Sequence, residues 1–256
     1  MKNHERREDR IHPAENAVIG INAVTELLKS ERSIDKIFIA EKQRPGAYAE
    51  IKRLAKEKGV PFILTDRGKI DRLCPGASHQ GVAALTAEAD YATIDDILHL
   101  AAERGQPPFL LLADKISDPH NLGAMIRCAE GAGAHGIVIT KRNCAGVSPV
   151  VHKSSAGAVA HLRIARVANL VSAIEELKQK GVWIYGAEAG GSSLYEMDLA
   201  GPAAFVMGSE GDGLSKLVKE KCDFLLSIPM YGKVNSFNVS TAAAVILCEA
   251  ARQRNN

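Results

Sequence analysis

The sequence lacks the features that mark membrane-spanning, secreted and metal-binding proteins. No stretch approaches the roughly 18 consecutive apolar residues that a membrane span requires, and the charged start of the chain has no apolar core like that of a signal peptide. Its five cysteines form no C-x-x-C pair and have no histidine at metal-ligand spacing. Because an odd, scattered set of cysteines is typical of reduced thiols, we expect a cytoplasmic globular protein without a metal site.

The sequence also lacks a strong excess of positive or negative charge. The 32 Lys and Arg residues nearly balance the 30 Asp and Glu residues, and a net charge of +2 predicts no particular partner. Residues 35–72 are the exception, since ten basic and six acidic side chains leave a local excess of +4. That excess fits either a solvated helix face or a surface that contacts nucleic acid, and composition leaves both open.

Short apolar runs alternate with amphipathic stretches along the chain, which predicts an α/β fold. Because helical patterns separate the runs, we expect mostly parallel pairing of strands in both halves. The expected strands lie at 36–40, 61–65, 81–87, 109–113, 136–140, 161–165, 182–188, 203–207 and 224–229.

The chain of 256 residues is long enough for two domains. A helical stretch that runs into two consecutive prolines makes a plausible boundary near residue 100. We expect a flexible tail (1–13), a first domain (14–90), a linker (91–107) and a second domain (108–256).

Three segments between an expected strand and an expected helix are candidates for chemistry. The first follows the strand at 109–113 and contains Asp118, Asn121 and Arg127. Ligands of α/β sheets bind at such strand ends. Asp118 or Asn121 could equally cap the helix, and Arg127 could be a plain surface charge.

The other two segments are rich in glycine or in small polar residues. Residues 208–213 hold three glycines in six positions, which lets the backbone approach a ligand closely, but they match neither a P-loop nor a dinucleotide fingerprint. Residues 228–240 contain Asn235, Ser236 and Asn238, which is more than one helix cap requires.

Taken together and in this order, the three segments resemble the motifs of the SpoU/TrmH (SPOUT) family of RNA ribose 2′-O-methyltransferases. The patterns D-P-x-N-x-G-x-x-x-R, G-x-E-G-x-G and I-P-M-x-G-x-x-x-S-x-N-V-S all occur within residues 108–256. Residues 17–87 are similar to the L30e-like substrate-binding domain of that family, and His79-Gln80-Gly81 stands where the RlmB-like 23S rRNA guanosine methyltransferases carry this triplet. The tRNA branch of the family lacks this first domain.

The resemblance implies a fold and a cofactor that periodicity could not show. It implies a second domain with a mostly parallel sheet and a deep trefoil knot, a topology that general rules would exclude. S-adenosylmethionine would bind in the knot, and two copies of the chain would form a homodimer. By resemblance, the residues that line the cofactor pocket are Gly208, Ile228, Met230 and Phe237, and the catalytic residues are Asn121, Arg127, Glu210, Ser236 and Asn238.

Methyl transfer to a ribose requires that the hydroxyl is held in line with the methyl group while it loses its proton. Arg127 matches the catalytic arginine of the family. Because a guanidinium rarely deprotonates, we expect it to clamp the neighbouring phosphate, oriented by Asn121 and Glu210. Ser236 and Asn238 would position the phosphate or the cofactor, and no metal is needed.

The implied activity is methylation of a guanosine in the peptidyltransferase-centre loop of 23S rRNA. Three alternatives stay open: a tRNA methyltransferase, an antibiotic-resistance rRNA methyltransferase that shares both domains, and a non-catalytic RNA-binding protein. The complete catalytic set argues against the last. The terminal helix over 239–252 is apolar around most of its circumference, which fits either core burial or a dimer interface.

Overall fold

The computed structural model describes residues 17–30, 32, 34–41, 46, 48–74, 78–86 and 91–255. The chain forms two compact units, residues 1–88 and 89–256. The tail expected at 1–13 lies outside the described residues. Among the helices of the described part, none is both long and apolar enough to cross a membrane.

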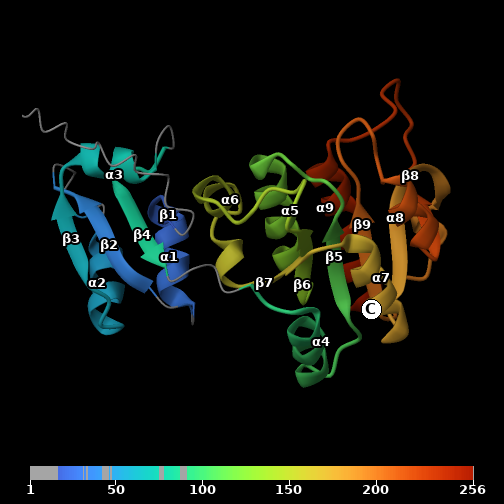
Figure 1. The fold of residues 1–256 in the computed structure, drawn as a ribbon, viewed down its shortest axis with the longest axis horizontal. Coiled ribbons are helices and arrows are strands. Elements are labelled where there is room, and N and C mark those ends of the chain that lie inside the picture. The colour runs from blue at the N-terminus through green and yellow to red at the C-terminus, as the bar shows by residue number, and fades with distance from the viewer. Residues whose placement is uncertain are drawn as a thin grey trace, which may run out of the picture. The chain divides into compact units, whose positions relative to one another are not determined.

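The first unit is a four-stranded sheet with helices on both faces (Figure 1). Its elements are β1 (Ala17–Ile19), α1 (Ile21–Lys29), β2 (Ile34–Ala40), α2 (Ala49–Glu57), β3 (Phe62–Thr65), α3 (Arg67–Leu73) and β4 (Val82–Thr86). The strands lie in the order β1-β4-β2-β3. Alternation along β2 fills two cores, since Ile37 and Ile39 pack with α1 and α2 while Phe38 and Ala40 pack with α3.

The expectation of mostly parallel strands is wrong for the first unit. β2 and β3 are parallel, but β4 runs antiparallel to both of its neighbours, β1 and β2. The chain turns at Gln80 and Gly81, whose φ angles are 53° and 79°, and enters β4 in the opposite direction. Hydrophobic periodicity locates strands but does not specify their neighbours, so it could not predict this insertion.

The second unit is a six-stranded sheet in the order β10-β8-β9-β5-β6-β7, and every pairing in it is parallel. The prediction of a mostly parallel sheet is confirmed here. Its helices are α4 (Ile94–Glu103), α5 (Pro119–Gly131), α6 (Pro149–Ser154), α7 (Leu170–Gln179), α8 (Lys216–Lys221) and α9 (Val239–Arg254). Its strands are β5 (Phe109–Ala113), β6 (Gly136–Thr140), β7 (Arg163–Val167), β8 (Trp183–Ser193), β9 (Ala203–Met207) and β10 (Phe224–Ser227).

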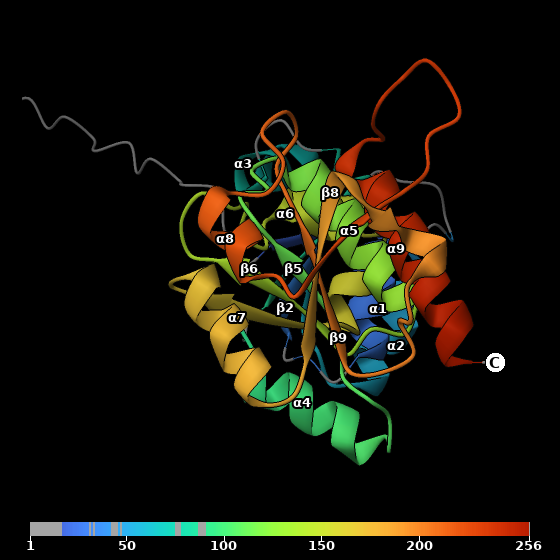
Figure 2. The same ribbon diagram turned by 90° about the vertical axis from the view of Figure 1, so that its right-hand side faces the viewer.

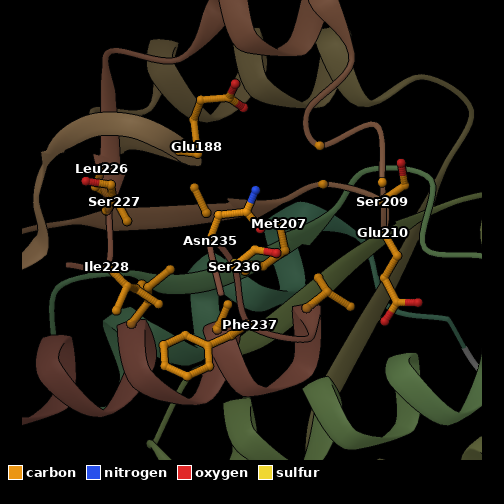
Figure 3. A pocket seen from close by; sticks show the side chains of 18 of the residues that line it. Glu188, Met207, Ser209, Glu210, Leu226, Ser227, Ile228, Asn235, Ser236 and Phe237 are labelled. Atoms are coloured by element: carbon orange, nitrogen blue, oxygen red, sulfur yellow. The ribbon is translucent and has the colours of Figure 1, made fainter. Parts of the chain in front are cut away.

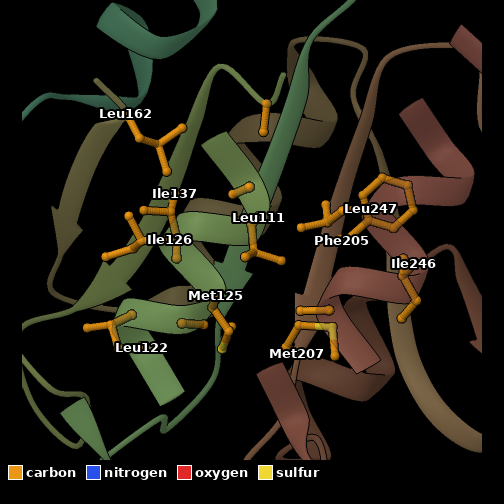
Figure 4. Packing of buried hydrophobic residues seen from close by; sticks show 14 of the residues in the cluster. Leu111, Leu122, Met125, Ile126, Ile137, Leu162, Phe205, Met207, Ile246 and Leu247 are labelled. Atoms are coloured by element: carbon orange, nitrogen blue, oxygen red, sulfur yellow. The ribbon is translucent and has the colours of Figure 1, made fainter. Parts of the chain in front are cut away.

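Both faces of this sheet are buried. Along β5, Phe109, Leu111 and Ala113 pack with α5 and α9, whereas Leu110 and Leu112 pack with α4 and α7. Figure 2 shows α5 and α9 on one side of the strands and α7 and α8 on the other. Figure 4 shows the first of these cores, in which side chains of α5 and α9 meet those of the central strands.

Two helices of the second unit, α4 and α9, bury apolar side chains in these cores. The stretch expected as a linker contains α4, whose Ile94 and Ile97 are buried in the core of the second unit. The terminal helix α9 buries one stripe of side chains within the chain, and Cys248 on another side is exposed. The stripe consists of Val239, Ala243, Ile246, Leu247 and Ala250.

Candidate active site

The loop after β5 begins the site, because the carboxyl ends of parallel strands share one edge of the sheet. Asp118 is the N-cap of α5, and its side chain accepts a hydrogen bond from the backbone N–H of His120 at 2.9 Å. The capping role therefore belongs to Asp118, which leaves Asn121, in the first turn of α5, available for other partners. Asn121 is 9% exposed.

The glycine-rich loop after β9 is held closed by its own backbone. Ser209 and Gly213 exchange two N–H···O bonds of 3.0 and 3.1 Å. A side chain at Gly208 would place its Cβ 2.2 Å from the carbonyl carbon of Gly213, so only glycine allows this approach. Beyond the loop, the buried carboxylate of Asp114 accepts a bond from the backbone N–H of Ser215 at 2.6 Å and ties the loop to the end of β5.

The third segment, residues 228–238, is irregular and leads from β10 into α9. Its last residue, Asn238, is the N-cap of α9, and the side-chain Oδ1 accepts bonds from the backbone N–H and the hydroxyl of Ser240 at 2.9 and 2.6 Å. This cap uses the oxygen of the amide group and leaves its nitrogen free to donate elsewhere. Asn238 is thus both a helix cap and a member of the site.

Three polar side chains join the three segments. Glu210 Oε1 accepts hydrogen bonds from Asn121 Nδ2 at 2.8 Å and from Asn238 Nδ2 at 2.6 Å. Asn238 Nδ2 also lies 3.1 Å from Asn121 Oδ1, its acceptor on α5. Asn121 is separated in the sequence from Glu210 by 89 positions and from Asn238 by 117 positions, yet the three form one hydrogen-bonded cluster. Such a cluster fixes the relative positions of the three loops.

A pocket of about 400 Å³ lies beside this cluster (Figure 3). The four side chains or backbone positions predicted to hold the cofactor, Gly208, Ile228, Met230 and Phe237, all line it. Two predicted catalytic residues, Glu210 and Ser236, line it as well. Asn121 and Asn238 do not line the pocket and reach it through Glu210.

Arg127 lies apart from this arrangement. No hydrogen bond joins it to Asn121 or Glu210 in the described chain, so the expectation that these two residues orient it stays a prediction. Six residues along a helix rotate by about 600°, which places two side chains roughly 120° apart; Asn121 points inward and Arg127 is exposed. Arg127 forms no hydrogen bond or ion pair with the described residues. Burial and the neighbouring Cys248 raise the pKa of the Cys128 thiol, and the positive charge of Arg127 partly offsets this increase.

Sequence reasoning missed one charged residue of the pocket. Glu188, in the middle of β8 and two residues beyond the last pairing of that strand with β9 at Gly186, lines the pocket and forms a 2.8 Å ion pair with Lys219 of α8. A lone carboxylate in a strand belongs to no motif, so its position after the apolar start of β8 was the available signal. Within the described residues, no group of three His, Cys, Asp or Glu side chains is arranged to hold a metal ion.

Two family models match the chain. Residues 108–248 match the SpoU rRNA methylase family, and residues 17–92 match the model described as RNA 2′-O ribose methyltransferase substrate binding. The first match lies within the second unit, and the second match covers residues 17–88 of the first unit and extends to residue 92.

Individual proteins resemble the chain along most of its length. A Bacillus subtilis (strain 168) protein named for the TrmH family of tRNA/rRNA methyltransferases is 45% identical over 93% of this chain and 96% of its own. The SpoU methyltransferase AviRb of Streptomyces viridochromogenes, solved with AdoMet, has the same fold, with a TM-score of 0.79 over 98% of this chain and 94% of its own at 24% identity. The A. aeolicus TrmH/SpoU tRNA modifying enzyme is 30% identical and covers 59% of this chain and 77% of its own, with a TM-score of 0.52.

The methylase model spans more than half of the chain and includes all three segments that form the polar cluster and the pocket. The relative from B. subtilis extends the similarity through the first unit. On this evidence the chain belongs to the SpoU/TrmH family of RNA methyltransferases.

Proposed function

We propose that the protein transfers a methyl group from S-adenosylmethionine to the 2′-hydroxyl of a guanosine in 23S rRNA. The observation that carries this proposal is the cluster of Asn121, Glu210 and Asn238, which joins the three family motifs beside a pocket. The substrate-binding model that matches residues 17–92 supports RNA as the substrate and the ribose as the target.

The pocket has the chemistry that S-adenosylmethionine needs. Its volume of about 400 Å³ is in the range of small-molecule sites. Met207, Leu226 and Phe237 offer apolar surface for a purine, and Glu188 and Asn235 offer polar groups for the remainder of the molecule. When bound, the cofactor supplies a methyl group activated by its sulfonium charge. The SpoU methyltransferase AviRb of S. viridochromogenes and the rRNA methyltransferase of Sinorhizobium meliloti, which share this fold, were solved with AdoMet.

The residues of this chain would position the reacting groups and stabilise the charge that develops on the ribose hydroxyl. The Asn121–Glu210–Asn238 cluster holds the loops that form the pocket in one geometry, which a reaction in line requires. Arg127 is exposed and has no partner among the described residues, so its planar guanidinium is available to grip an RNA phosphate with two hydrogen bonds. Held beside the ribose, that positive charge favours loss of the hydroxyl proton.

An rRNA substrate agrees better than a tRNA with the two-unit organisation. The tRNA modifying enzyme of A. aeolicus matches 59% of this chain, whereas the rRNA methyltransferase of Sinorhizobium meliloti matches 92%. The first unit also carries the local excess of positive charge over residues 35–72, which is suited to RNA phosphates. The relative from B. subtilis is named for tRNA and rRNA alike, so a tRNA methyltransferase is the alternative that an experiment must test.

A homodimer and a knotted chain complete the proposal. In one chain Arg127 does not line the pocket, so a second copy that contributes surface to the site would account for its position. Sedimentation of the protein at micromolar concentration should give about twice the 27.4 kDa of the chain. A species of single-chain mass alone would contradict the dimer.

The test is methyl transfer from tritiated S-adenosylmethionine to unmodified 23S rRNA, 16S rRNA and bulk tRNA. We expect label in 23S rRNA, at a guanosine where alkaline hydrolysis stops because the 2′-oxygen is blocked. Label in tRNA alone would favour the alternative. If cofactor binds but no RNA is labelled, the protein is an RNA-binding member without activity.

A further inference from the structure

Glu188 is a pocket residue that none of the three family motifs contains. It extends from β8, on the side of the pocket opposite Phe237, as Figure 3 shows. Its side chain is 25% exposed, so it is partly shielded from solvent. Glu188 lies two residues beyond the last pairing of β8 with β9, at Gly186, and beside the glycine-rich loop that follows β9. Ligands of α/β sheets bind beyond the carboxyl ends of neighbouring strands, so the end of β9 makes this a suitable position for recognising a nucleoside.

The two oxygens of Glu188 have different surroundings. Oε1 accepts the hydrogen bond from Lys219 Nζ at 2.8 Å. Oε2 has no hydrogen-bond partner among the described residues, and it lies 3.5 Å from the position that a Cβ would take at Gly213. The free oxygen is therefore beside the loop that forms one wall of the pocket.

The ion pair with Lys219 decides which ligand group suits this oxygen. Together the two side chains carry no net charge, so they attract a ligand ammonium group weakly. A neutral hydroxyl needs no charge compensation and donates well to a carboxylate oxygen. The apolar surface near Phe237 and Ile228 is suited to a purine, and the sugar attached to that purine would lie toward the polar rim.

The ion pair between Glu188 and Lys219 differs from the other ion pairs around α8 because one of its members lines the pocket. Two other pairs link α8 and its neighbourhood to α7: Lys221 with Glu175 at 2.6 Å and Lys178 with Asp223 at 2.6 Å. None of these four side chains lines the pocket. Glu188 differs from the other acids of this group because its free oxygen belongs to the pocket.

We propose that Glu188 recognises the cofactor by accepting hydrogen bonds from its ribose hydroxyls, and that Lys219 is the positioning residue that holds the carboxylate in place. This inference rests on the proposed function, because it assumes that the pocket binds S-adenosylmethionine. On this proposal, the side chain of Glu188 makes the pocket prefer a cofactor with ribose over one with deoxyribose.

The experiment compares two ligands by titration calorimetry: S-adenosylhomocysteine and its 2′,3′-dideoxy analogue. The wild-type protein should bind the first at least about tenfold more tightly, the scale of a hydrogen bond to a charged group. Glu188→Ala should lose this preference by weakening only the binding of S-adenosylhomocysteine. Glu188→Gln keeps the shape of the side chain and should lose most of the preference, which covers the case in which the alanine variant folds poorly.

Lys219→Met should reduce the preference in the same direction, whereas Lys221→Met on the same helix should leave it unchanged. A general loss of structure would weaken both ligands equally, and that result in Glu188→Gln would overturn the inference while leaving the proposed function intact. An unchanged preference in Glu188→Gln would overturn it too. If the wild-type protein binds neither ligand, the proposed function itself fails.

Discussion

The two units of the chain share a plan, helices on both faces of a sheet, yet they use their strand ends differently. In the second unit every strand pair is parallel, so the carboxyl ends of β5 and β9 lie side by side and their loops meet at Asn121 and Glu210. In the first unit β4 runs antiparallel between β1 and β2. The carboxyl end of β4 therefore lies at the opposite edge of the sheet from those of β1 and β2, and distant loops are not gathered in the same way.

The triplet His79-Gln80-Gly81 illustrates this difference. Gln80 Oε1 accepts a bond from the backbone N–H of Ile21 at 3.0 Å, and Tyr48 donates its hydroxyl to the Gln80 carbonyl at 2.7 Å. His79 is buried and bonds to Asp71. A sequence motif that helps to identify the family therefore builds the turn into β4, whereas the motifs of the second unit build a pocket.

The largest effect should come from Arg127 in the second unit. Arg127→Ala should reduce single-turnover methylation at least about a hundredfold, the scale of one lost transition-state contact, and leave S-adenosylhomocysteine affinity unchanged in calorimetry. Arg127→Lys should restore little, because an ammonium cannot form the planar two-pronged grip. Arg252→Ala, which removes another exposed arginine, is the control. Loss of cofactor binding in Arg127→Ala would contradict the assigned role.

Acid should weaken the second unit through its buried histidine. His135 Nδ1 accepts the backbone N–H of Phe109 at 3.1 Å, and burial, followed by the charges of Arg104 and Arg254, lowers its pKa to about 4. The ordinary pKa of histidine is near 6.5. At pH values between about 4 and 6.5, the unfolded chain therefore binds more protons than the folded chain does. The stability is thus complete above pH 6.5 and lost as pH falls toward 4, by about 3 kcal/mol.

Urea unfolding of the second unit between pH 4 and 7 measures this loss. His135→Gln should flatten the pH dependence, whatever its effect on stability at pH 7. His99→Gln, at a side chain 72% exposed, should leave the dependence as it is in the wild type. An equally steep loss in His135→Gln would assign the acid sensitivity to another group.

A smaller effect should separate the pocket from RNA binding. Gly208→Ala must push the loop backbone apart, because its Cβ would lie 2.2 Å from Gly213, and overpacking of this kind costs about 1–3 kcal/mol. We expect S-adenosylhomocysteine affinity to fall about tenfold while RNA affinity is kept. Gly201→Ala, where no atom lies within 4 Å, should change neither. Calorimetry and filter binding measure the two affinities, and a matching loss of RNA affinity would contradict the separation.

These residues also show what the sequence could predict. The strands at Phe109–Ala113, Gly136–Thr140 and Ala203–Met207 are predicted to the residue, because burial on both faces makes them continuous apolar runs. The strand expected at 161–165 is shifted to Arg163–Val167, since a short helical turn at Ala158–Ala160 leads into it. The three-residue strand Ala17–Ile19 was missed because it is too short to show a period.

The sequence predicted the site only in part, because the motifs name residues but do not specify which of them meet in the folded chain. The motifs named Asn121, Glu210 and Asn238, and the structure brings them within hydrogen-bonding distance of one another. Asn121 and Arg127 both lie in α5, and their spacing of six positions places the two side chains roughly 120° apart, so only Asn121 faces the cluster. Glu188 reaches the pocket through the order of the strands, and strand order is a property of tertiary packing.

The smallest effect should come from the turn of the first unit, and it tests whether the triplet there is structural. α1 has no side-chain cap from its own N-cap residue, Gly20, and Gln80 supplies the acceptor from 59 positions away. Gln80→Ala should therefore lower the stability of the first unit by about 1 kcal/mol, the usual worth of a helix cap. Gln80→Glu keeps an acceptor and should recover most of it. Hydrogen exchange at the amide of Ile21 reads this bond directly, and cofactor affinity in the second unit should not change. If Gln80→Ala keeps full stability but loses RNA affinity, the side chain contacts RNA and the contrast between the two units is less sharp than their sheets suggest.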